Sequence, residues 1–466
     1  MKILVTQRKW LDDSDLRFDA SFHLSEGQLT ILAFKKAKIQ TEPLQNVTER
    51  IFYGGRSRRI YVMNPENGLP FIKGADIINS NFFSLKSISK RHTANLKEYF
   101  LEKGWTLITR SGTVGRTAYV NNDFIEKAAS DDIIRVVPKT LPAGFIYAFL
   151  SSRPGQGLLA HGTYGAVIQH IEPEHIENIP VPIFPFEKQL EIHNLITQAA
   201  DLRVDANKLL VDSEELFLRE LSINNKNEHL FAHSEKIMGN IFSVNKCNIS
   251  TLSLRARNYS PRKQRIIELS KSKKYQKLID VLECDPFYGA RFKRIEASNQ
   301  NVELLSQGDI FDYKPKGRMI STRNIKNFEN ELVRKGTILI PAQGTLGENE
   351  IFGRAKFVWG YLENKLVAGH AMRFIPNPEK IGEGYLYAVL SSRMWLRLLR
   401  NSVYGTNLLG FIIPFLNEYP IPRFDNGVEQ IIDEKVKDAY NKLTISIDLE
   451  NQAIQLVEKE IEQWQQ

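Results

Sequence analysis

The chain has few cysteines and no long apolar run. Its 466 residues include two cysteines, Cys247 and Cys284. Two are too few for a disulfide framework or a cysteine-rich zinc site, and this favours a reducing compartment. The N-terminal apolar run is too short for a signal peptide, and no stretch reaches the roughly 18 apolar residues that a membrane helix needs. We therefore expect a soluble, cytoplasmic protein.

The excess of positive over negative charge is also small. The chain has 62 Lys and Arg residues against 54 Asp and Glu residues, a net charge of +8, and 42% of its residues are hydrophobic. This composition is ordinary for a globular protein. The excess is modest for the length, so a polyanionic partner such as nucleic acid is indicated only if the basic residues cluster. The length itself predicts two or three domains.

Motifs for catalysis are missing or incomplete. The nine histidines form no HExxH motif and no zinc-finger spacing. The segment "DPFY" (285–288) resembles the (D/N/S)PP(Y/F) motif of amino-methyltransferases, but Phe287 replaces the second proline and no Gly-rich adenosylmethionine loop precedes it. The segments "SGTVGR" (111–116) and "QGTLGE" (343–348) lack the lysine of a phosphate-binding loop, and a strand-to-strand turn fits them better. We expect no catalysis, no metal and no cofactor.

A nine-residue sequence occurs in two similar copies, "FYGGRSRRI" (52–60) and "FYGARFKRI" (287–295). Further matches follow in the same order, with offsets of 232 to 240 residues: "KGWTLITRSGTVG" (103–115) with "KGTILIPAQGTLG" (335–347), "GFIYAFLSSR" (144–153) with "GYLYAVLSSR" (384–393), Tyr164-Gly165 with Tyr404-Gly405, and "IPVP" (179–182) with "YPIP" (419–422). A shared order with slowly drifting offsets indicates a tandem duplication.

Each copy predicts the same mixed α/β (α+β) plan. Short apolar runs such as "TLITR", "DDIIRVV", "TILI" and "AMRFI" predict strands, "GFIYAFLSSRPGQGLL" predicts a helical stretch, and the proline-spaced segments predict extended backbone. A long helix closes each copy, and "SINNKNEHLFAH" (222–233) reads as the linker. The expected domains are residues 1–185 and 238–424, with spacer helices at 186–222 and 427–466.

The closing helices have a narrow apolar row at 3/4 spacing. Such a row, flanked by charges, is typical of a coiled coil, so we expect the two helices to pair in antiparallel fashion as a spacer roughly 54 Å long. Two unrelated amphipathic helices, each on its own domain, are the alternative. The row comprises Ile192, Leu195, Ala199, Leu202, Ala206, Leu209, Ser213 and Leu216 in the first helix, and Tyr440, Leu443, Ile447, Glu450, Ile454, Val457, Ile461 and Trp464 in the second.

Basic residues cluster at matching places in the two copies. In a strand, Arg56 and Arg58, like Arg291 and Lys293, would project to one face. A solvated face would explain one such cluster, whereas its recurrence favours contact with phosphate. The candidate DNA-binding residues are Arg56, Arg58, Arg59, Arg110, Ser111, Arg291, Lys293, Arg294, Lys314, Lys316, Arg318 and Arg323.

The doubled motifs resemble the specificity subunit of type I restriction–modification enzymes. The matching segments are "RFDASF" (17–22), "LITRSGTVGR", "AASDDIIRV", "YAFLSSR", "GTYGAVIQHI" and "IPVPIFPFEKQLEI", most of them present twice. The resemblance implies two target recognition domains that each read one half of a bipartite DNA site. It also implies two helices that dock two modification (methyltransferase) subunits, with restriction (translocase–nuclease) subunits joining that core. It implies no activity for this subunit alone.

The two copies can read different half-sites only through segments in which they differ. We therefore expect the shared Arg56, Arg59, Arg291 and Arg294 to contact phosphate or brace the domain. Base readers are expected in residues 77–100, 121–127, 311–330 and 348–366, with Lys314, Lys316, Arg318, Arg323 and Lys326 as the richest candidates because Arg commonly reads guanine. A stand-alone methyltransferase or nuclease, and a protein-binding scaffold, are the alternative functions.

Overall fold

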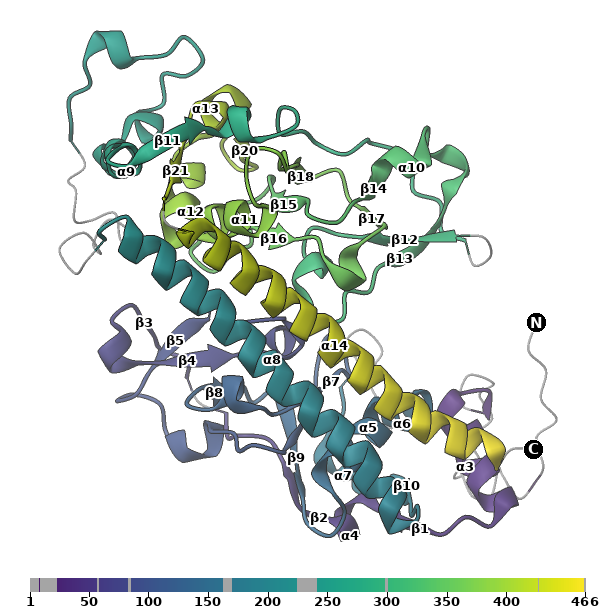
Figure 1. Ribbon diagram of the computed structural model, residues 1–466. Helices are drawn as coiled ribbons and strands as arrows, with labels where there is room; N and C mark the ends of the chain where they lie inside the picture. Colours follow the sequence, from purple (N-terminus) through teal and green to yellow (C-terminus); the bar gives the residue numbers. More distant parts are fainter. Residues whose placement is uncertain are drawn as a thin grey trace. The chain divides into compact units, whose positions relative to one another are not determined.

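The computed structural model describes residue 8 and residues 23–56, 58–82, 85–161, 170–223, 241–297, 301–425 and 427–464. It divides into two compact units: unit 1 is Met1–Val204 with Ile445–Gln466, and unit 2 is Asp205–Thr444. Each unit thus contains the globular part of one sequence copy and one end of each long helix (Figure 1). The motif at 17–22, the pair Tyr164-Gly165 and residues 224–233 of the linker lie outside the described residues.

Unit 1 combines two four-stranded sheets with short helices. One sheet has the order β2-β9-β6-β7 and the other the order β3-β5-β4-β8. The helices are α3 (Glu26–Ala37), α4 (Leu44–Val47), α5 (Ala143–Ser151), α6 (Arg153–His161) and α7 (Pro173–Ile176). The strands are β1 (Thr41–Pro43), β2 (Thr48–Phe52), β3 (Tyr61–Val62), β4 (Gly68–Ile72), β5 (Lys86–Ser89), β6 (Thr106–Thr109), β7 (Thr117–Tyr119), β8 (Ala128–Ala129), β9 (Ile133–Pro138) and β10 (Pro180–Pro182).

Unit 2 has a similar plan, with one three-stranded and one four-stranded sheet. Its sheets have the orders β16-β15-β18 and β13-β12-β17-β14. The helices are α9 (Pro261–Lys271), α10 (Phe328–Glu331), α11 (Glu383–Ser391), α12 (Arg393–Arg400) and α13 (Ile413–Asn417). The strands are β11 (Lys274–Lys277), β12 (Asn301–Leu305), β13 (Arg318–Ser321), β14 (Leu332–Val333), β15 (Ile338–Pro341), β16 (Lys356–Phe357), β17 (Lys365–Val367), β18 (Ala371–Phe374), β19 (Val403–Tyr404), β20 (Gly410–Phe411) and β21 (Pro420–Arg423).

The strands predicted from apolar runs are present in both copies. The runs at 106–109 and 338–341 form β6 and β15, which are buried at every position because neighbouring strands and helices cover both of their faces. The predicted helical stretch is two helices, α5 and α6. Ser152 ends α5 with extended backbone, and its hydroxyl accepts a hydrogen bond from the backbone N–H of Gly155.

The two Gly-rich segments are strand-to-strand connections, as predicted. The first joins the antiparallel strands β6 and β7, and the second joins β15 and β16. Gly112 and Gly115 have φ of 77° and 84°, backbone conformations that residues with a Cβ rarely adopt. The first connection therefore needs glycine for its backbone conformation.

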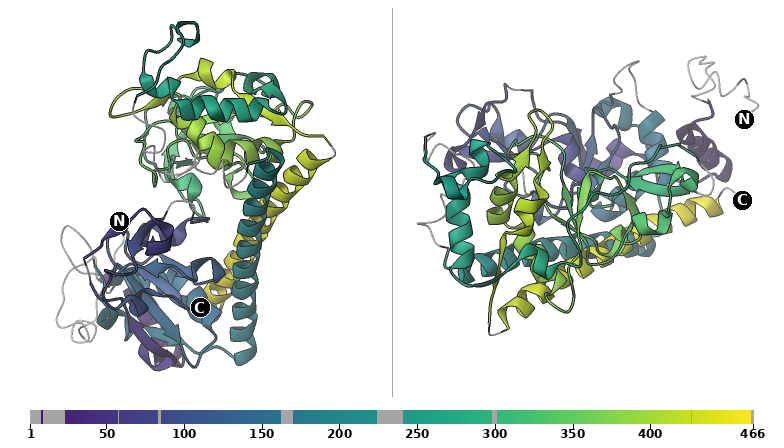
Figure 2. Two further views of the ribbon diagram at one scale, coloured as in Figure 1. Left: turned by 90° about the vertical axis from the view of Figure 1, so that its left-hand side faces the viewer. Right: turned by 90° about the horizontal axis from the view of Figure 1, so that it is seen from above.

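The long helices are α8 (Phe186–Glu220, 35 residues) and α14 (Val428–Gln463, 36 residues). Neither contains proline or glycine, and Figure 2 shows α8 in teal and α14 in yellow without a break. In unit 1 the start of α8 packs with the end of α14, and in unit 2 the end of α8 packs with the start of α14. The pair is therefore antiparallel. Among the described residues, no helix combines the length and apolar character of a membrane span.

The contact row of each long helix differs partly from the predicted one. Ten of the predicted residues are buried: Ile192, Ala199, Ala206, Ser213, Tyr440, Leu443, Ile447, Glu450, Val457 and Ile461. The other six are half-buried: Leu195, Leu202, Leu209, Leu216, Ile454 and Trp464. Ile196, Arg203 and Phe217 are buried instead of their preceding neighbours. Each helix end packs on its globular unit as well as on its partner helix, so the buried face is broader than a two-helix seam.

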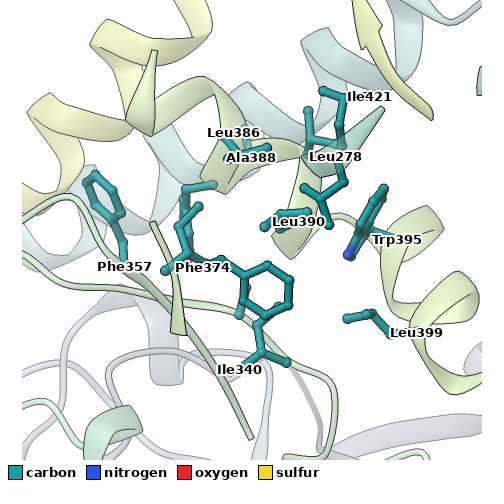
Figure 3. Packing of buried hydrophobic residues seen from close by; sticks show 14 of the residues in the cluster. Leu278, Ile340, Phe357, Phe374, Leu386, Ala388, Leu390, Trp395, Leu399 and Ile421 are labelled. Atoms are coloured by element: carbon teal, nitrogen blue, oxygen red, sulfur yellow. The ribbon is translucent and has the colours of Figure 1, made fainter. Parts of the chain in front are cut away.

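Each unit has an apolar core between its sheets and helices. In unit 2, Trp395 of α12 and Phe374 of β18 are fully buried, and Figure 3 shows their rings with Ile340, Leu390 and Leu399. In unit 1, Phe145 and Phe149 of α5 pack with Ile108 and Ile134 of the sheet. These cores fix the sheets from which the basic stretches extend.

Candidate nucleic-acid interface

The repeated nine-residue stretch crosses from one sheet to the other in each unit. In unit 1, Phe52 pairs with Arg135 in β9, and Ile60 accepts a hydrogen bond from the N–H of Ser89 in β5. In unit 2, Phe287 bridges Arg373 in β18, and Ile295 accepts from the N–H of Ser321 in β13, 2.8 Å away. None of the described residues between these anchor points lies in a strand. The predicted strand face of alternating basic side chains is therefore wrong.

A buried arginine lies beside the first part of each crossing. The guanidinium of Arg135 donates to the carbonyl oxygens of Ala129 (2.7 Å) and Ile133 (2.8 Å), and that of Arg373 donates to the carbonyl of Glu331 (2.8 Å). Burial lowers the pKa of Arg135 to about 10 and also lowers the pKa of Arg373. These arginines brace backbone and are not available to DNA.

The glycine that both copies share lies against this buried guanidinium. A Cβ on Gly289 would lie 2.8 Å from Nη2 of Arg373, and a Cβ on Gly54 would lie 3.5 Å from Nη2 of Arg135. The next residue is tied down as well. The backbone N–H of Gly55 donates to Glu98, and that of Ala290 donates to Glu331. The shared "FYG" sequence is thus explained by packing and by backbone hydrogen bonds.

In unit 1, two of the predicted arginines are engaged by an acidic pair. Arg59 Nη2 lies 2.5 Å from Asp131 and 3.4 Å from Asp132, and Arg56 Nε lies 3.6 Å from Asp131. Burial lowers the pKa of Arg59, but the hydrogen bonds and charges of the two aspartates outweigh burial and raise it. Arg58 is exposed and forms no ion pair within the described part of the chain.

Arg110 and Ser111 are also engaged inside unit 1. Arg110 is only 5% exposed, and its Nε donates to Glu172 at 3.0 Å. The hydrogen bond to Glu172 raises the pKa of Arg110. Ser111 donates to Asp132 at 3.1 Å. Both side chains therefore hold the turn after β6 against acidic residues of unit 1.

In unit 2, the matching basic residues are exposed. Arg291, Lys293 and Arg294 form no ion pair with any described residue. Arg291 and Arg294 instead line a hollow of about 420 Å³ together with Gln343 and His370. Burial lowers the pKa of His370, and the two nearby arginine charges lower it further.

The structure brings the predicted base readers of unit 2 next to this stretch. Arg318 begins β13, the strand whose Ile320 bridges Glu296, and Arg318 lies 3.6 Å from the Glu296 carboxylate. Arg323 follows in the 3-10 helix Thr322–Asn324 and is exposed. Lys316 and Lys326 are exposed, whereas Lys314 is half-buried. The end of the basic stretch thus lies next to β13 in unit 2.

Sequence reasoning missed the residues that organise this region. Arg135 and Arg373 were visible as the shared arginine of "SDDIIR" and "AGHAMR", but nothing in the sequence marks them as buried. Glu98 and Glu331 follow no shared motif. Among the described residues, no group of three His, Cys, Asp or Glu side chains gathers as a metal site would require.

Part of the chain matches a known family. Residues 58–208 match the family described as the type I restriction modification DNA specificity domain. The S subunit of the type I restriction–modification system from M. genitalium is 13% identical with a TM-score of 0.39, over 90% of this chain and 95% of that one. The HsdS subunit from Thermoanaerobacter tengcongensis is 12% identical with a TM-score of 0.27, over 90% and 95%.

A third similar structure comes from work on complex assembly and conformational transition of the type I R-M system. It is 10% identical with a TM-score of 0.28, over 91% of this chain and 97% of that one. No curated protein sequence matches the chain. The matched family is the one that the doubled motifs resemble, and the match covers residues 58–208 of this chain.

Proposed function

We propose that this chain is the non-catalytic specificity subunit of a type I restriction–modification complex. Residues 1–185 and 238–424 would each read one half of a bipartite site in double-stranded DNA. The observation that carries the proposal is the doubled scaffold. Both units hold the same basic stretch between two sheets with the same buried arginine, and the first of them matches the specificity-domain family.

The long helices would dock two methyltransferase subunits, to which restriction subunits bind. Their exposed apolar side chains support this part of the proposal. Phe186 and Leu190 at the start of α8 are 64% and 40% exposed, and Ile431 near the start of α14 is 47% exposed. Single exposed apolar residues are common, but several along one pair of helices favour contact with another protein.

Co-expression with the methyltransferase subunit encoded beside this gene tests the function. The expected result is methylated adenine in a split motif, detected by sequencing genomic DNA. Methylation in a continuous motif, or none, would contradict the proposal. Adenosylmethionine binding by the isolated chain would instead indicate a stand-alone methyltransferase. A DNA affinity that does not fall with salt would indicate a protein-binding scaffold.

A further inference from the structure

The two units differ in charge at one pair of matching backbone positions. The N–H of Arg110 donates to the carbonyl of Asp132, and the N–H of Ala342 donates to the carbonyl of His370, both at 2.9 Å. Asp132 and His370 therefore occupy matching backbone positions. Asp131 then matches Gly369. At these two matched positions, unit 1 has two carboxylates and unit 2 has none.

The carboxylates of unit 1 pair with two arginines of the basic stretch. Asp131 contacts both Arg56 and Arg59, and Asp132 contacts Arg59 as well as Ser111. The side chain of Asp131 is only 12% exposed, so water screens its charge weakly. An anion approaching Arg59 would have to displace these ion pairs.

The same place in unit 2 is open and positively charged. A Cβ on Gly369 would lie 2.7 Å from the carbonyl oxygen of Gly289, so no larger residue fits there without a shift of backbone. The carboxylate of Glu331 is already engaged, at 2.9 Å by the N–H of Ala290 and at 3.3 Å by Arg373. The hollow of about 420 Å³ therefore contains Arg291 and Arg294 with no carboxylate paired to them among the described residues.

We propose that this hollow of unit 2 is a phosphate-binding site, and that Asp131 and Asp132 close the equivalent site of unit 1. Arg291 and Arg294 supply the positive charge, and the amide of Gln343 and the imidazole of His370 supply neutral hydrogen-bond donors. Guanidinium groups suit phosphate because they donate two parallel hydrogen bonds to its oxygens. The natural ligand would be a backbone phosphate of DNA, and this part of the inference rests on the proposed function.

Calorimetric titration of the full chain with inorganic phosphate tests the site without DNA. The wild-type chain should bind one phosphate. His370→Asp introduces the carboxylate that unit 1 has at this position, and it should weaken binding at least about tenfold by repulsion and by neutralising the arginines. His370→Asn is the matched neutral control and should keep the site. Asp131→Asn with Asp132→Asn preserves shape in unit 1 while removing charge, and this double variant should bind two phosphates.

Three results would overturn the inference. They are no phosphate bound by the wild-type chain, unchanged binding by His370→Asp, and a single phosphate bound by the Asp131→Asn, Asp132→Asn variant. Thermal melting of each variant checks that it folds. If His370→Asp fails to fold, Arg291→Met with Arg294→Met provides the same test, because both arginines are exposed and their loss should abolish binding.

A DNA arm distinguishes the source of the phosphate. For a backbone contact, His370→Asp should reduce the slope of log K against log salt by about 1. A site that binds free phosphate while the DNA slope stays unchanged would exclude DNA as the ligand. If the chain binds one phosphate that His370→Asp abolishes, yet binds no DNA, the proposed function fails and the anion site stands. If DNA binding depends on salt but phosphate binding is absent, the anion site fails and the proposed function stands.

Discussion

The guanidinium of Arg135 lies 5.7 Å from the centroid of the Phe52 ring, and the two residues pair across β9 and β2. Unit 2 repeats this relationship at 5.8 Å between Arg373 and Phe287. A cation over an aromatic ring at this distance is favourable, more so when water is excluded. The same contact between a phenylalanine ring and a buried guanidinium thus explains why both copies have the "FYG" sequence. The basic residues of each stretch follow this contact in the chain.

Substitution of the anchoring glycines should have unequal effects. Gly289→Ala should destabilise the protein by about 1–3 kcal/mol, because its Cβ would lie 2.8 Å from a guanidinium that backbone carbonyls hold in place. Gly54→Ala is the matched variant and should cost less, because its closest contact is 3.3 Å. Urea unfolding of both variants measures the difference. A larger loss for Gly54→Ala would contradict this account of the stretch.

The buried charge pair between the long helices should contribute more to folding stability than an exposed pair. Arg203 and Glu450 lie 2.8 Å apart with side chains 9% and 4% exposed, and Tyr147 also donates to Glu450. Glu450→Gln keeps a hydrogen-bond acceptor but removes the negative charge that lies beside Arg203, and should cost about 3–5 kcal/mol.

The control for this variant is Glu462→Gln. Its pair with Arg153 at 3.0 Å has side chains 51% and 60% exposed, so its loss should cost less than about 1 kcal/mol. Melting temperatures of both variants give the comparison. Equal effects would mean that burial of the Arg203–Glu450 pair does not control its contribution.

Lys356 should make stability depend on pH. Burial lowers the pKa of Lys356 from 10.5 to about 8, and the charge of Asp312 opposes this only in part. Between pH 8 and 10.5 the unfolded chain binds the proton more tightly than the folded one, so stability should rise with pH across this window. Below pH 8 the loss of stability caused by burying the charged Lys356 side chain is fully present.

Lys356→Met should therefore raise the melting temperature more at pH 7 than at pH 10. Its position in unit 1 is occupied by Ala118, so an apolar side chain fits the fold there. Lys335→Met is the control, because the Lys335 side chain is 52% exposed. An equal gain at both pH values would show that Lys356 is charged in the folded protein throughout.

The proposed division between phosphate contacts and base readers can be tested by methylation profiling. Arg291→Ala should weaken modification evenly at every site, because a phosphate contact carries no base information. Arg323→Ala should relax one position of one half-site, with a loss of about 1–3 kcal/mol of discrimination. A changed motif in Arg291→Ala would contradict the assignment of the shared arginines. An unchanged motif in Arg323→Ala would remove Arg323 from the base readers.

The sequence by itself determined the duplication, the strands β6, β9, β15 and β18, and the two long helices. Apolar runs between turn residues report local burial, and long stretches without proline or glycine report helix, so these features need no knowledge of distant contacts. The sequence did not determine which row of residues makes the helix contacts. Neighbouring rows such as Leu195 and Ile196 share one periodicity, and only the packing of both helices on the globular units selects between them.

Only the tertiary structure decided which basic residues are available to a ligand. Arg59 and Asp131 are 72 residues apart in the chain, and no local pattern shows that they meet. The same holds for Arg110 with Glu172, which removes a predicted contact residue from the surface. Two stretches with almost the same sequence therefore differ in charge at the surface, because an ion pair depends on the distance between side chains and not on their spacing in sequence.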